Sequence, residues 1–349
     1  MDFYELIAFA KKNNCSDVHI TVGTNVAVRR YGKLEILPDV PTAAQSQQMI
    51  MAALSPAQQE VVLRGNDLDL AIVLQDGSRL RANIYHQRNN LAAAYRILHT
   101  EIPTMDELKI PMAVRNLINA PRGLVLVTGP TGCGKTTTLA SMIDCINQTQ
   151  SKHVITIEDP IEYVYYHAKS MIHQREVGKD VGDFASALRS SLREDPDIIL
   201  VGEMRDYETI NAAMTAAETG HLVLSTLHTS SAAQTVDRII DAYPPHAQNQ
   251  ARFLLAKVLR GVCTQVLVPM DFEDGMTIAT EVLINNDAVA NMIRENKVHQ
   301  LVTNIQAGGN VGMHTMNSDL KRLETQMVIS RDTALKFCSN IKEYTALSL

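Results

Sequence analysis

One short run of residues constrains this chain more than any other feature. The run Gly129-Pro-Thr-Gly-Cys-Gly-Lys135-Thr136 matches the pattern G-x-x-x-x-G-K-[ST] at every required position. An apolar, strand-like stretch (124–128) precedes it, and a stretch of helical character (136–147) follows it. In that setting backbone amides cradle phosphates, the lysine reaches the β- and γ-phosphates, and the threonine hydroxyl holds magnesium. The predicted nucleotide-binding residues are Gly129, Pro130, Thr131, Gly132, Cys133, Gly134, Lys135, Thr136 and Thr137.

Strands and helices alternate in the part of the chain around this loop. Apolar stretches separated by helical ones lie at 123–128, 153–157, 197–201 and 221–227. Near-continuous apolar strands between helices indicate a parallel sheet with helices on both faces. We therefore expect an α/β domain over residues 107–349, with short helices from Asp287 onward.

Polar side chains follow three of these predicted strands. Glu158 and Asp159 end the second strand, and Glu162 comes soon after them. Glu203 follows the third strand and His228 the fourth. Ligands of open α/β sheets bind outside the carboxyl ends of the strands, so these side chains are predicted to meet at the nucleotide.

The acidic residues divide into two predicted roles. A magnesium-linked aspartate usually precedes the glutamate of the third strand, but Gly202 stands there instead. Glu158 or Asp159 is then the natural partner of Thr136 in holding magnesium, directly or through metal-bound water. Glu203 remains to orient and activate the attacking water, a role that needs geometry more than a shifted pKa.

The two histidines of the fourth strand cannot share one role. His221 and His228 are seven residues apart, which is about 23 Å along a strand. His228 is predicted at the phosphate end, where it can sense the γ-phosphate. His221 is predicted at the opposite end, as a structural residue or as part of a contact between subunits.

The first hundred residues predict a separate α+β domain. Apolar periodicity favours a helix at 2–12, strands at 17–22, 26–31 and 33–37, and two helices within 43–64 that are broken at Ser55-Pro56. Alternation from Asp67 onward and the turn signal Asp76-Gly77 favour further antiparallel strands up to residue 98. The predicted organisation is an N-terminal domain over 1–98, a linker over 99–106 and the α/β domain over 107–349.

The N-terminal domain carries four arginines on or beside its last two predicted strands, Arg79, Arg81, Arg88 and Arg96. One interpretation is a solvated face. The other is an arginine supplied to the nucleotide of a neighbouring subunit, because such a residue stabilises the charge that develops during phosphoryl transfer.

Composition excludes several other classes of protein. The net charge is −6, aromatic residues make up 5% and tryptophan is absent, which disfavours binding of nucleic acid through basic grooves and stacking platforms. The five cysteines are far apart and form no Cys-x-x-Cys, so we expect reduced thiols; Cys133 is interpreted as a small residue tolerated in the loop rather than as a redox switch. No run is long and apolar enough for a transmembrane helix, and the N-terminus lacks the features of a signal peptide. We therefore expect a cytoplasmic protein without direct membrane insertion.

Four sequence boxes together resemble those of the type IV pilus retraction ATPases, a branch of the secretion ATPase superfamily. They are the phosphate-binding loop at 129–138, the aspartate box Ile155-Thr-Ile-Glu-Asp-Pro-Ile-Glu162, the atypical Walker B segment Asp195–Asp206 and the histidine box Gly220–His228. Ser16-Asp17-Val18-His19-Ile20 and Ile293-Arg-Glu-Asn-Lys297 are also similar to this family. The resemblance covers residues 1–340, and the glycine at position 202 is itself a habit of the family.

The resemblance implies a PAS-like N-terminal domain, a RecA-like ATPase domain and a homohexameric ring. It further implies hydrolysis of ATP with Mg²⁺, coupled to pilus disassembly at a platform protein on the cytoplasmic face of the inner membrane. Motif by motif, it assigns Glu203 as the catalytic carboxylate, Glu158 and Glu162 as the acids of the aspartate box, and Arg81 and Arg96 as arginines that face a neighbour's nucleotide. Arg238 is implied to approach the nucleotide.

Alternatives remain within and outside this family. A related ATPase of a secretion, conjugation or pilus-assembly system is the main one, although the longer N-terminal region and the four-cysteine insertion of the extension class are absent here. A GTPase is disfavoured because Asn296-Lys297 does not continue to an aspartate. One departure bears on function: the family usually has an arginine where this chain has Ala290, in a segment linked to retraction.

Overall fold

The computed structural model describes residues 1–38, 40–74, 76–98 and 101–347, which form two compact units. Unit 1 contains Met1–Glu101 and Pro160–Val164, and unit 2 contains Ile102–Asp159 and Tyr165–Leu349. Residues 99–100 of the predicted linker lie outside the described residues. The predicted domain boundaries stay predictions.

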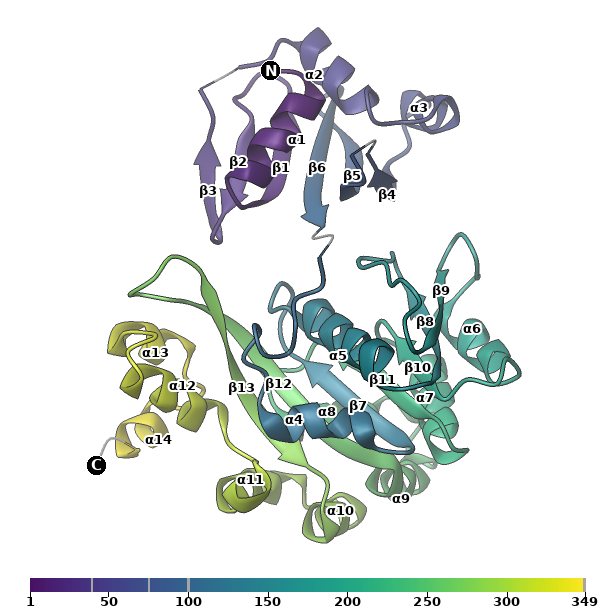
Figure 1. The fold of residues 1–349 in the computed structure, drawn as a ribbon, viewed down its shortest axis with the longest axis vertical. Coiled ribbons are helices and arrows are strands. Elements are labelled where there is room, and N and C mark those ends of the chain that lie inside the picture. Colours follow the sequence, from purple (N-terminus) through teal and green to yellow (C-terminus); the bar gives the residue numbers. More distant parts are fainter. Residues whose placement is uncertain (39, 75, 99–100, 348–349) are drawn as a thin grey trace. The chain divides into compact units, whose positions relative to one another are not determined.

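Unit 1 is a six-stranded antiparallel sheet with the strand order β3-β2-β1-β6-β5-β4 (Figure 1). Its elements are α1 (Phe3–Lys12), β1 (Cys15–Thr21), β2 (Ala27–Arg30), β3 (Lys33–Ile36), α2 (Ala43–Met51), α3 (Pro56–Leu63), β4 (Leu68–Val73), β5 (Arg79–Gln87) and β6 (Asn90–Leu98). Asp2, Thr42 and Ser55 begin the three helices with capping boxes, in which the side chain accepts from the third helical amide. Apolar residues of all three helices pack on one face of the sheet.

Unit 2 is built on a seven-stranded sheet with the order β13-β12-β7-β11-β10-β8-β9 (Figure 1). Its strands are β7 (Gly123–Thr128), β8 (His153–Glu158), β9 (Met171–Glu176), β10 (Ile198–Val201), β11 (Leu222–Leu227), β12 (Leu259–Pro269) and β13 (Met276–Ile284). Six of these strands run parallel, and β13 pairs antiparallel to β12 at one edge. The expected α/β fold class is confirmed, and β7 lies between β11 and β12.

The helices of unit 2 follow the predicted alternation. They are α4 (Met112–Asn116), α5 (Lys135–Thr149), α6 (Phe184–Ser191), α7 (Tyr207–Glu218), α8 (Ala232–Asp241), α9 (Gln248–Val258), α10 (Asp287–Arg294), α11 (Leu301–Ala307), α12 (Met316–Thr325), α13 (Arg331–Phe337) and α14 (Ile341–Ala346), with short 3₁₀ turns at Leu117–Asn119, Val298–Gln300 and Gly309–Val311. The short helices expected after Asp287 are confirmed as α10 to α14. Strands β9, β12 and β13 were not predicted.

The unpredicted strands lack the continuous apolar signal of the central ones. Strand β9 is polar, with the sequence MIHQRE, because it lies at an edge of the sheet and exposes Met171 and His173. Strand β12 carries buried polar side chains, Thr264 and Gln265, within its apolar run. These polar residues weaken the local pattern, and only their tertiary partners make their burial favourable.

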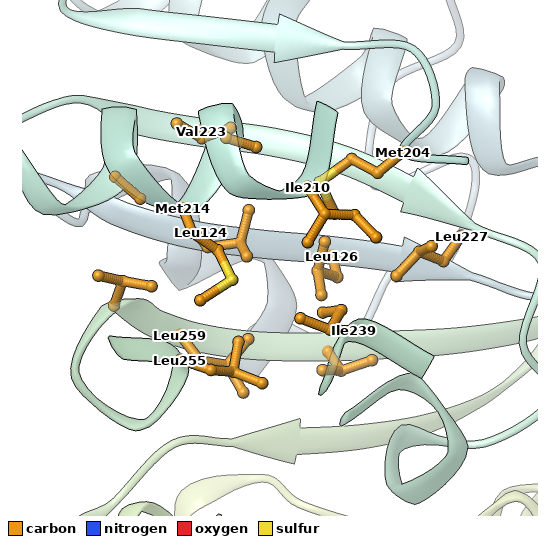
Figure 2. Close-up of a cluster of buried hydrophobic side chains, with 14 of the residues drawn as sticks. Leu124, Leu126, Met204, Ile210, Met214, Val223, Leu227, Ile239, Leu255 and Leu259 are labelled. Atoms are coloured by element: carbon orange, nitrogen blue, oxygen red, sulfur yellow. The ribbon is translucent and has the colours of Figure 1, made fainter. Parts of the chain in front are cut away.

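A continuous apolar core fixes the position of β7. Helices α6 to α9 cover one face of the sheet, where Leu124 and Leu126 of β7 pack with Ile210 and Met214 of α7 and with Leu255 of α9 (Figure 2). Helix α5 packs against β7 and β11 from the other face. Every residue of β7 is buried, so the chain leaves the core only after Thr128, where the phosphate-binding loop begins.

Candidate nucleotide site

The phosphate-binding loop of unit 2 joins β7 to α5 and has an unusual backbone. Gly129, Gly132 and Gly134 have φ values of 141°, 80° and 87°, which residues with side chains rarely adopt. A Cβ atom at Gly129 would lie 2.2 Å from the backbone oxygen of Gln265. Glycine is therefore required at 129 by both conformation and space, and the loop follows the fold that its motif predicts.

Lys135 is the first residue of α5, and its amine turns back into the loop. Its Nζ donates to the carbonyl oxygens of Gly129 at 2.9 Å and Pro130 at 3.0 Å, and the residue is 8% exposed. Thr136 and Thr137 follow in the first turn of the helix. A phosphate group would offer this buried amine a full negative charge in place of neutral carbonyl oxygens.

His228 connects the loop to the predicted catalytic carboxylate. Its Nδ1 lies 3.4 Å from both Lys135 Nζ and Thr131 Oγ1, and its Nε2 lies 3.0 Å from Glu203 Oε1. An ammonium group can only donate, so Nδ1 must accept and Nε2–H must donate to Glu203. The contacts therefore place a proton on Nε2.

Glu203 lies beyond the end of β10 and is held from two sides. Arg205 Nη2 is 2.8 Å from Glu203 Oε2, while His228 occupies the other oxygen. Burial alone raises the pKa of Glu203, but the hydrogen bonds from Arg205 and His228 and the charge of Arg205 outweigh burial and lower the pKa below its ordinary value. Glu203 is therefore an anion near neutral pH with both oxygens in fixed directions.

The acids of the second strand end differ in burial. Glu158 is 5% exposed at the end of β8, and its Oε1 accepts from Thr156 Oγ1 at 2.6 Å and from Gln174 Nε2 at 3.2 Å. Asp159 is exposed and lines a cavity of about 430 Å³ together with Arg189 and Arg205. Hydroxyl and carboxylate oxygens are the donors that Mg²⁺ prefers, so Thr136, Glu158 and Asp159 have the chemistry that the predicted metal site requires.

The remaining predicted residues of unit 2 lie near or away from this group. Arg238 lies on α8, and its Nη2 donates to the backbone oxygen of Arg205 at 3.4 Å, next to the residue that binds Glu203. His221 lies directly before β11, and its Nδ1 is 3.0 Å from the backbone oxygen of Ala216 in α7. The structure thus gives His221 a local contact at the end opposite to His228.

Three predicted catalytic residues belong to unit 1. Arg81 and Arg96 are direct register partners on β5 and β6, on the face turned away from the helices. Arg81 makes two contacts with Asp69, at 2.8 and 3.1 Å, and Arg96 Nε donates to Asp17 at 3.0 Å. Glu162 lies in the short segment that joins unit 1, and its backbone oxygen accepts from Arg79 at 3.2 Å. Their roles at a nucleotide stay predictions.

Sequence reasoning missed Gln265 of β12, which contacts the loop directly. It is fully buried, its Nε2 donates to Cys133 O at 2.7 Å, and its Oε1 accepts from Thr138 Oγ1 at 2.9 Å. The available signal was a polar amide inside an apolar run, because a buried amide needs partners. The partner of β12 in the sheet could not be identified from the chain itself.

None of the helices in the described part of the chain has the length and hydropathy that crossing a bilayer requires. Residues 1–38, 40–74, 76–98 and 101–347 contain no cluster of three histidine, cysteine or acidic residues arranged to hold a metal.

Comparison with known proteins places the chain in a family. Residues 5–334 match the model of the type II/IV secretion system proteins. The chain is 42% identical over 335 residues to the type IV pilus retraction ATPase PilT of Pseudomonas aeruginosa, covering 96% of this chain and 97% of the relative. It is 43% identical over 304 residues to a twitching motility protein of Neisseria gonorrhoeae, covering 87% of this chain and 81% of the relative.

A solved structure agrees with these sequence matches. The crystal structure of the pilus retraction motor PilT with bound ADP matches with a TM-score of 0.88 and 43% identity, covering 99% of each chain. The chain therefore belongs to the type II/IV secretion system protein family, in its branch of PilT-like type IV pilus retraction ATPases. The family inferred from the four sequence boxes is confirmed.

The contacts of Glu203 predict how its pKa responds to mutation. In Arg205→Gln, burial still raises the pKa of Glu203 while the charge of Arg205 is lost, so the pKa should move upward. Carboxyl ¹³C NMR titration of the Glu203 signal, assigned through Glu203→Gln, measures this shift. Arg189→Gln, which removes a cation of α6 beside the cavity that Arg205 also lines, is the control and should shift the pKa less. An unchanged pKa in Arg205→Gln would contradict the electrostatic account.

Proposed function

We propose that this chain is an ATP-hydrolysing motor that powers the retraction of type IV pili. The observation that carries the proposal is the continuous set of contacts from Lys135 through His228 and Glu203 to Arg205 at the ends of neighbouring parallel strands. A phosphate-binding loop without a carboxylate could serve a protein that only binds nucleotide. Here the Glu203 carboxylate is oriented and is connected to Lys135 through His228, an arrangement that suits hydrolysis. Alignment over most of the chain with relatives named for pilus retraction and for twitching motility supports the coupling.

In this proposal ATP displaces carbonyl contacts within the loop. The β- and γ-phosphates take Lys135 from Gly129 O and Pro130 O, and the loop amides hold the phosphate oxygens. Nδ1 of His228 then loses its contact with the Lys135 amine, and the ring can change its position when the γ-phosphate is bound. Because Nε2 of the same ring binds Glu203, the position of the carboxylate depends on occupancy of the loop.

Glu203 supplies the base in the proposed reaction. It is anionic near neutral pH, and it orients a water for attack on the γ-phosphorus while accepting a hydrogen bond from that water. Thr136, with Glu158 and Asp159, would hold the Mg²⁺ that neutralises phosphate charge when bound. Arg238, next to the backbone of Arg205, would add positive charge beside the nucleotide.

The proposed assembly is a homohexameric ring in which unit 1 serves a neighbour. Arg81 and Arg96 face away from the core of unit 1, and each is paired with an aspartate. Exposed ion pairs contribute only about 0–1 kcal/mol, so exchanging an aspartate for a nucleotide phosphate costs little. Glu162, whose backbone oxygen accepts from Arg79, is proposed as the second acid of the aspartate box.

The proposed partner is a platform protein of the pilus machinery at the cytoplasmic face of the inner membrane, with no nucleic acid involved. Ala290 bears on this coupling because it lies on α10 and packs partly buried against the core of unit 2. Position 290 is far along the chain from the phosphate-binding loop. The replacement of the family arginine by Ala290 therefore concerns coupling and not hydrolysis.

The two parts of the site predict different defects. Glu203→Gln should bind ATP normally and lose about 10²–10³-fold in turnover, because the lost group acts mainly in the transition state. Lys135→Ala should instead lose binding, since the buried amine contacts the phosphates in every state. Phosphate release and fluorescent-nucleotide binding measure the two effects. Near-normal turnover in Glu203→Gln would assign the catalytic role to Glu158.

Retraction itself predicts a cellular phenotype. Cells that lack this protein should accumulate surface pili and lose twitching, and wild-type protein should restore both traits. Glu203→Gln, produced at equal level, should restore neither, because retraction requires turnover. Pilus counts by electron microscopy and twitching zones are the measurements. Normal retraction together with a defect in secretion would favour the alternative of a secretion ATPase.

Completion of the site in trans predicts recovery in mixed rings. Arg81→Ala and Glu203→Gln subunits should each be nearly inactive, because an arginine supplied in trans contributes about 10³–10⁵ in rate. Mixed rings contain interfaces with both groups intact and should regain a fraction of wild-type turnover, measured as phosphate release against subunit ratio. Arg96→Ala tests the neighbouring arginine in the same way.

The control for the mixing experiment is Asp69→Asn. This variant removes the ion-pair partner of Arg81 within unit 1 but keeps the guanidinium. If Arg81 acts only through Asp69, then Asp69→Asn should be as inactive as Arg81→Ala. Activity in Asp69→Asn, combined with recovery in mixed rings, supports action in trans; no recovery in rings shown to be mixed contradicts it.

A further inference from the structure

Gln265 occupies an unusual place for a polar side chain. It is fully buried in β12, directly after Thr264, which pairs in register with the last residue of β7, Thr128. The hydroxyls of Thr128 and Thr264 are 2.8 Å apart. Gln265 therefore extends beyond the end of β7 to the level of the phosphate-binding loop.

The amide of Gln265 is fixed at both ends by the two sides of that loop. Nε2 donates to the carbonyl of Cys133 at 2.7 Å, and Oε1 accepts from the hydroxyl of Thr138 in α5 at 2.9 Å. A carbonyl can only accept, so the nitrogen must face Cys133 and the amide cannot be reversed. Thr138 holds the other end of the amide, so Gln265 meets the loop in a single orientation.

The hydrogen bond to Cys133 controls the direction of the next amide. A trans peptide is planar, so the carbonyl of Cys133 and the N–H of Gly134 point in opposite directions. Because Gln265 holds the carbonyl toward β12, the N–H of Gly134 points away from β12. Among the described residues this N–H has no hydrogen-bond partner, which leaves it available to an anion.

The backbone of Gln265 adds a second restraint on the same loop. Its carbonyl oxygen lies 2.2 Å from the position that a Cβ atom of residue 129 would take, so it packs directly against Gly129. The side chain of Gln265 thus holds the carboxyl-terminal part of the loop while its backbone abuts the first glycine. Both restraints come from one residue on a neighbouring strand.

We propose that Gln265 is a positioning residue for phosphate binding, which holds the Cys133–Gly134 peptide in the orientation that presents an amide to the nucleotide. The inference rests on the proposed function, because it concerns the same loop. Gln265 itself does not touch the phosphates. It stabilises in advance a backbone conformation that an empty loop would otherwise leave to exchange with a flipped peptide.

The direct test is the affinity for ADP in Gln265→Met. Methionine preserves length and apolar packing but cannot donate to Cys133, so the peptide loses its restraint. Loss of one such hydrogen bond corresponds to about tenfold weaker binding of ADP, or about 1.4 kcal/mol. Binding is measured with fluorescent ADP in the presence of magnesium, well below the melting temperature of every variant.

A second pair of variants reports on the same restraint without altering Gln265. Thr138→Val removes the hydroxyl that orients the amide, and it should weaken ADP binding in the same direction by a smaller factor. Thr138→Ser keeps the hydroxyl and should bind ADP like the wild type. This pair decides the question if Gln265→Met does not fold.

Asn285→Leu is the matched control for loss of a structural amide. The Nδ2 of Asn285 donates to two backbone carbonyls, Ala256 O at 2.9 Å and Leu259 O at 2.8 Å, near the other end of β12. Its loss should lower the melting temperature and leave the affinity for ADP unchanged. Equal losses of ADP affinity in Asn285→Leu and Gln265→Met would overturn the inference, because both would reflect general destabilisation.

The outcomes also separate this inference from the proposed function. Wild-type affinity for ADP in folded Gln265→Met, or in Thr138→Val, would overturn the positioning role and leave the proposed function intact. Failure of the wild-type protein to bind ADP would overturn the proposed function and the inference with it. Weaker binding in Gln265→Met and Thr138→Val, with normal binding in Thr138→Ser and Asn285→Leu, supports the inference.

Discussion

The structure of unit 2 depends on the complete burial of β7 between two parallel neighbours. Thr128, its last residue, pairs in register with Leu227 of β11 on one side and with Thr264 of β12 on the other. A strand buried in this way has no freedom at its end, because its hydrogen bonds and both faces are already used. The loop that follows therefore begins at a fixed point, and the residues beyond both neighbouring strands, His228 and Gln265, reach it from opposite sides.

These two neighbours supply different kinds of control. On the side of β11, His228 contacts both the buried amine of Lys135 and the carboxylate of Glu203, so these two charged groups share one histidine partner. On the side of β12, Gln265 holds a neutral peptide of the loop and carries no charge. In the function proposed above, the charged residues beside β11 respond to the nucleotide, and Gln265 on β12 holds the loop ready to bind it.

Unit 1 presents the opposite arrangement, in which charge lies on a surface. Its helices bury one face of the antiparallel sheet, and the other face carries Arg81 and Arg96 beside Asp69 and Asp17. Ion pairs in such positions contribute little to stability. These arginines can therefore exchange their aspartates for another anion at low cost.

Residue type and spacing are enough to predict the elements that depend on local interactions. The phosphate-binding loop, the four central strands and the helix starts at Asp2, Thr42 and Ser55 follow from residue type and spacing, because turns, caps and apolar runs depend on near neighbours. Chain order also placed Glu158, Glu203 and His228 at strand ends. Tertiary structure alone decided that β12 pairs with β7, that Gln265 thereby reaches Cys133, and that Arg205 holds Glu203. These contacts join residues through sheet order and side-chain direction, and a buried amide such as Gln265 is stable only where the fold brings it a donor and an acceptor.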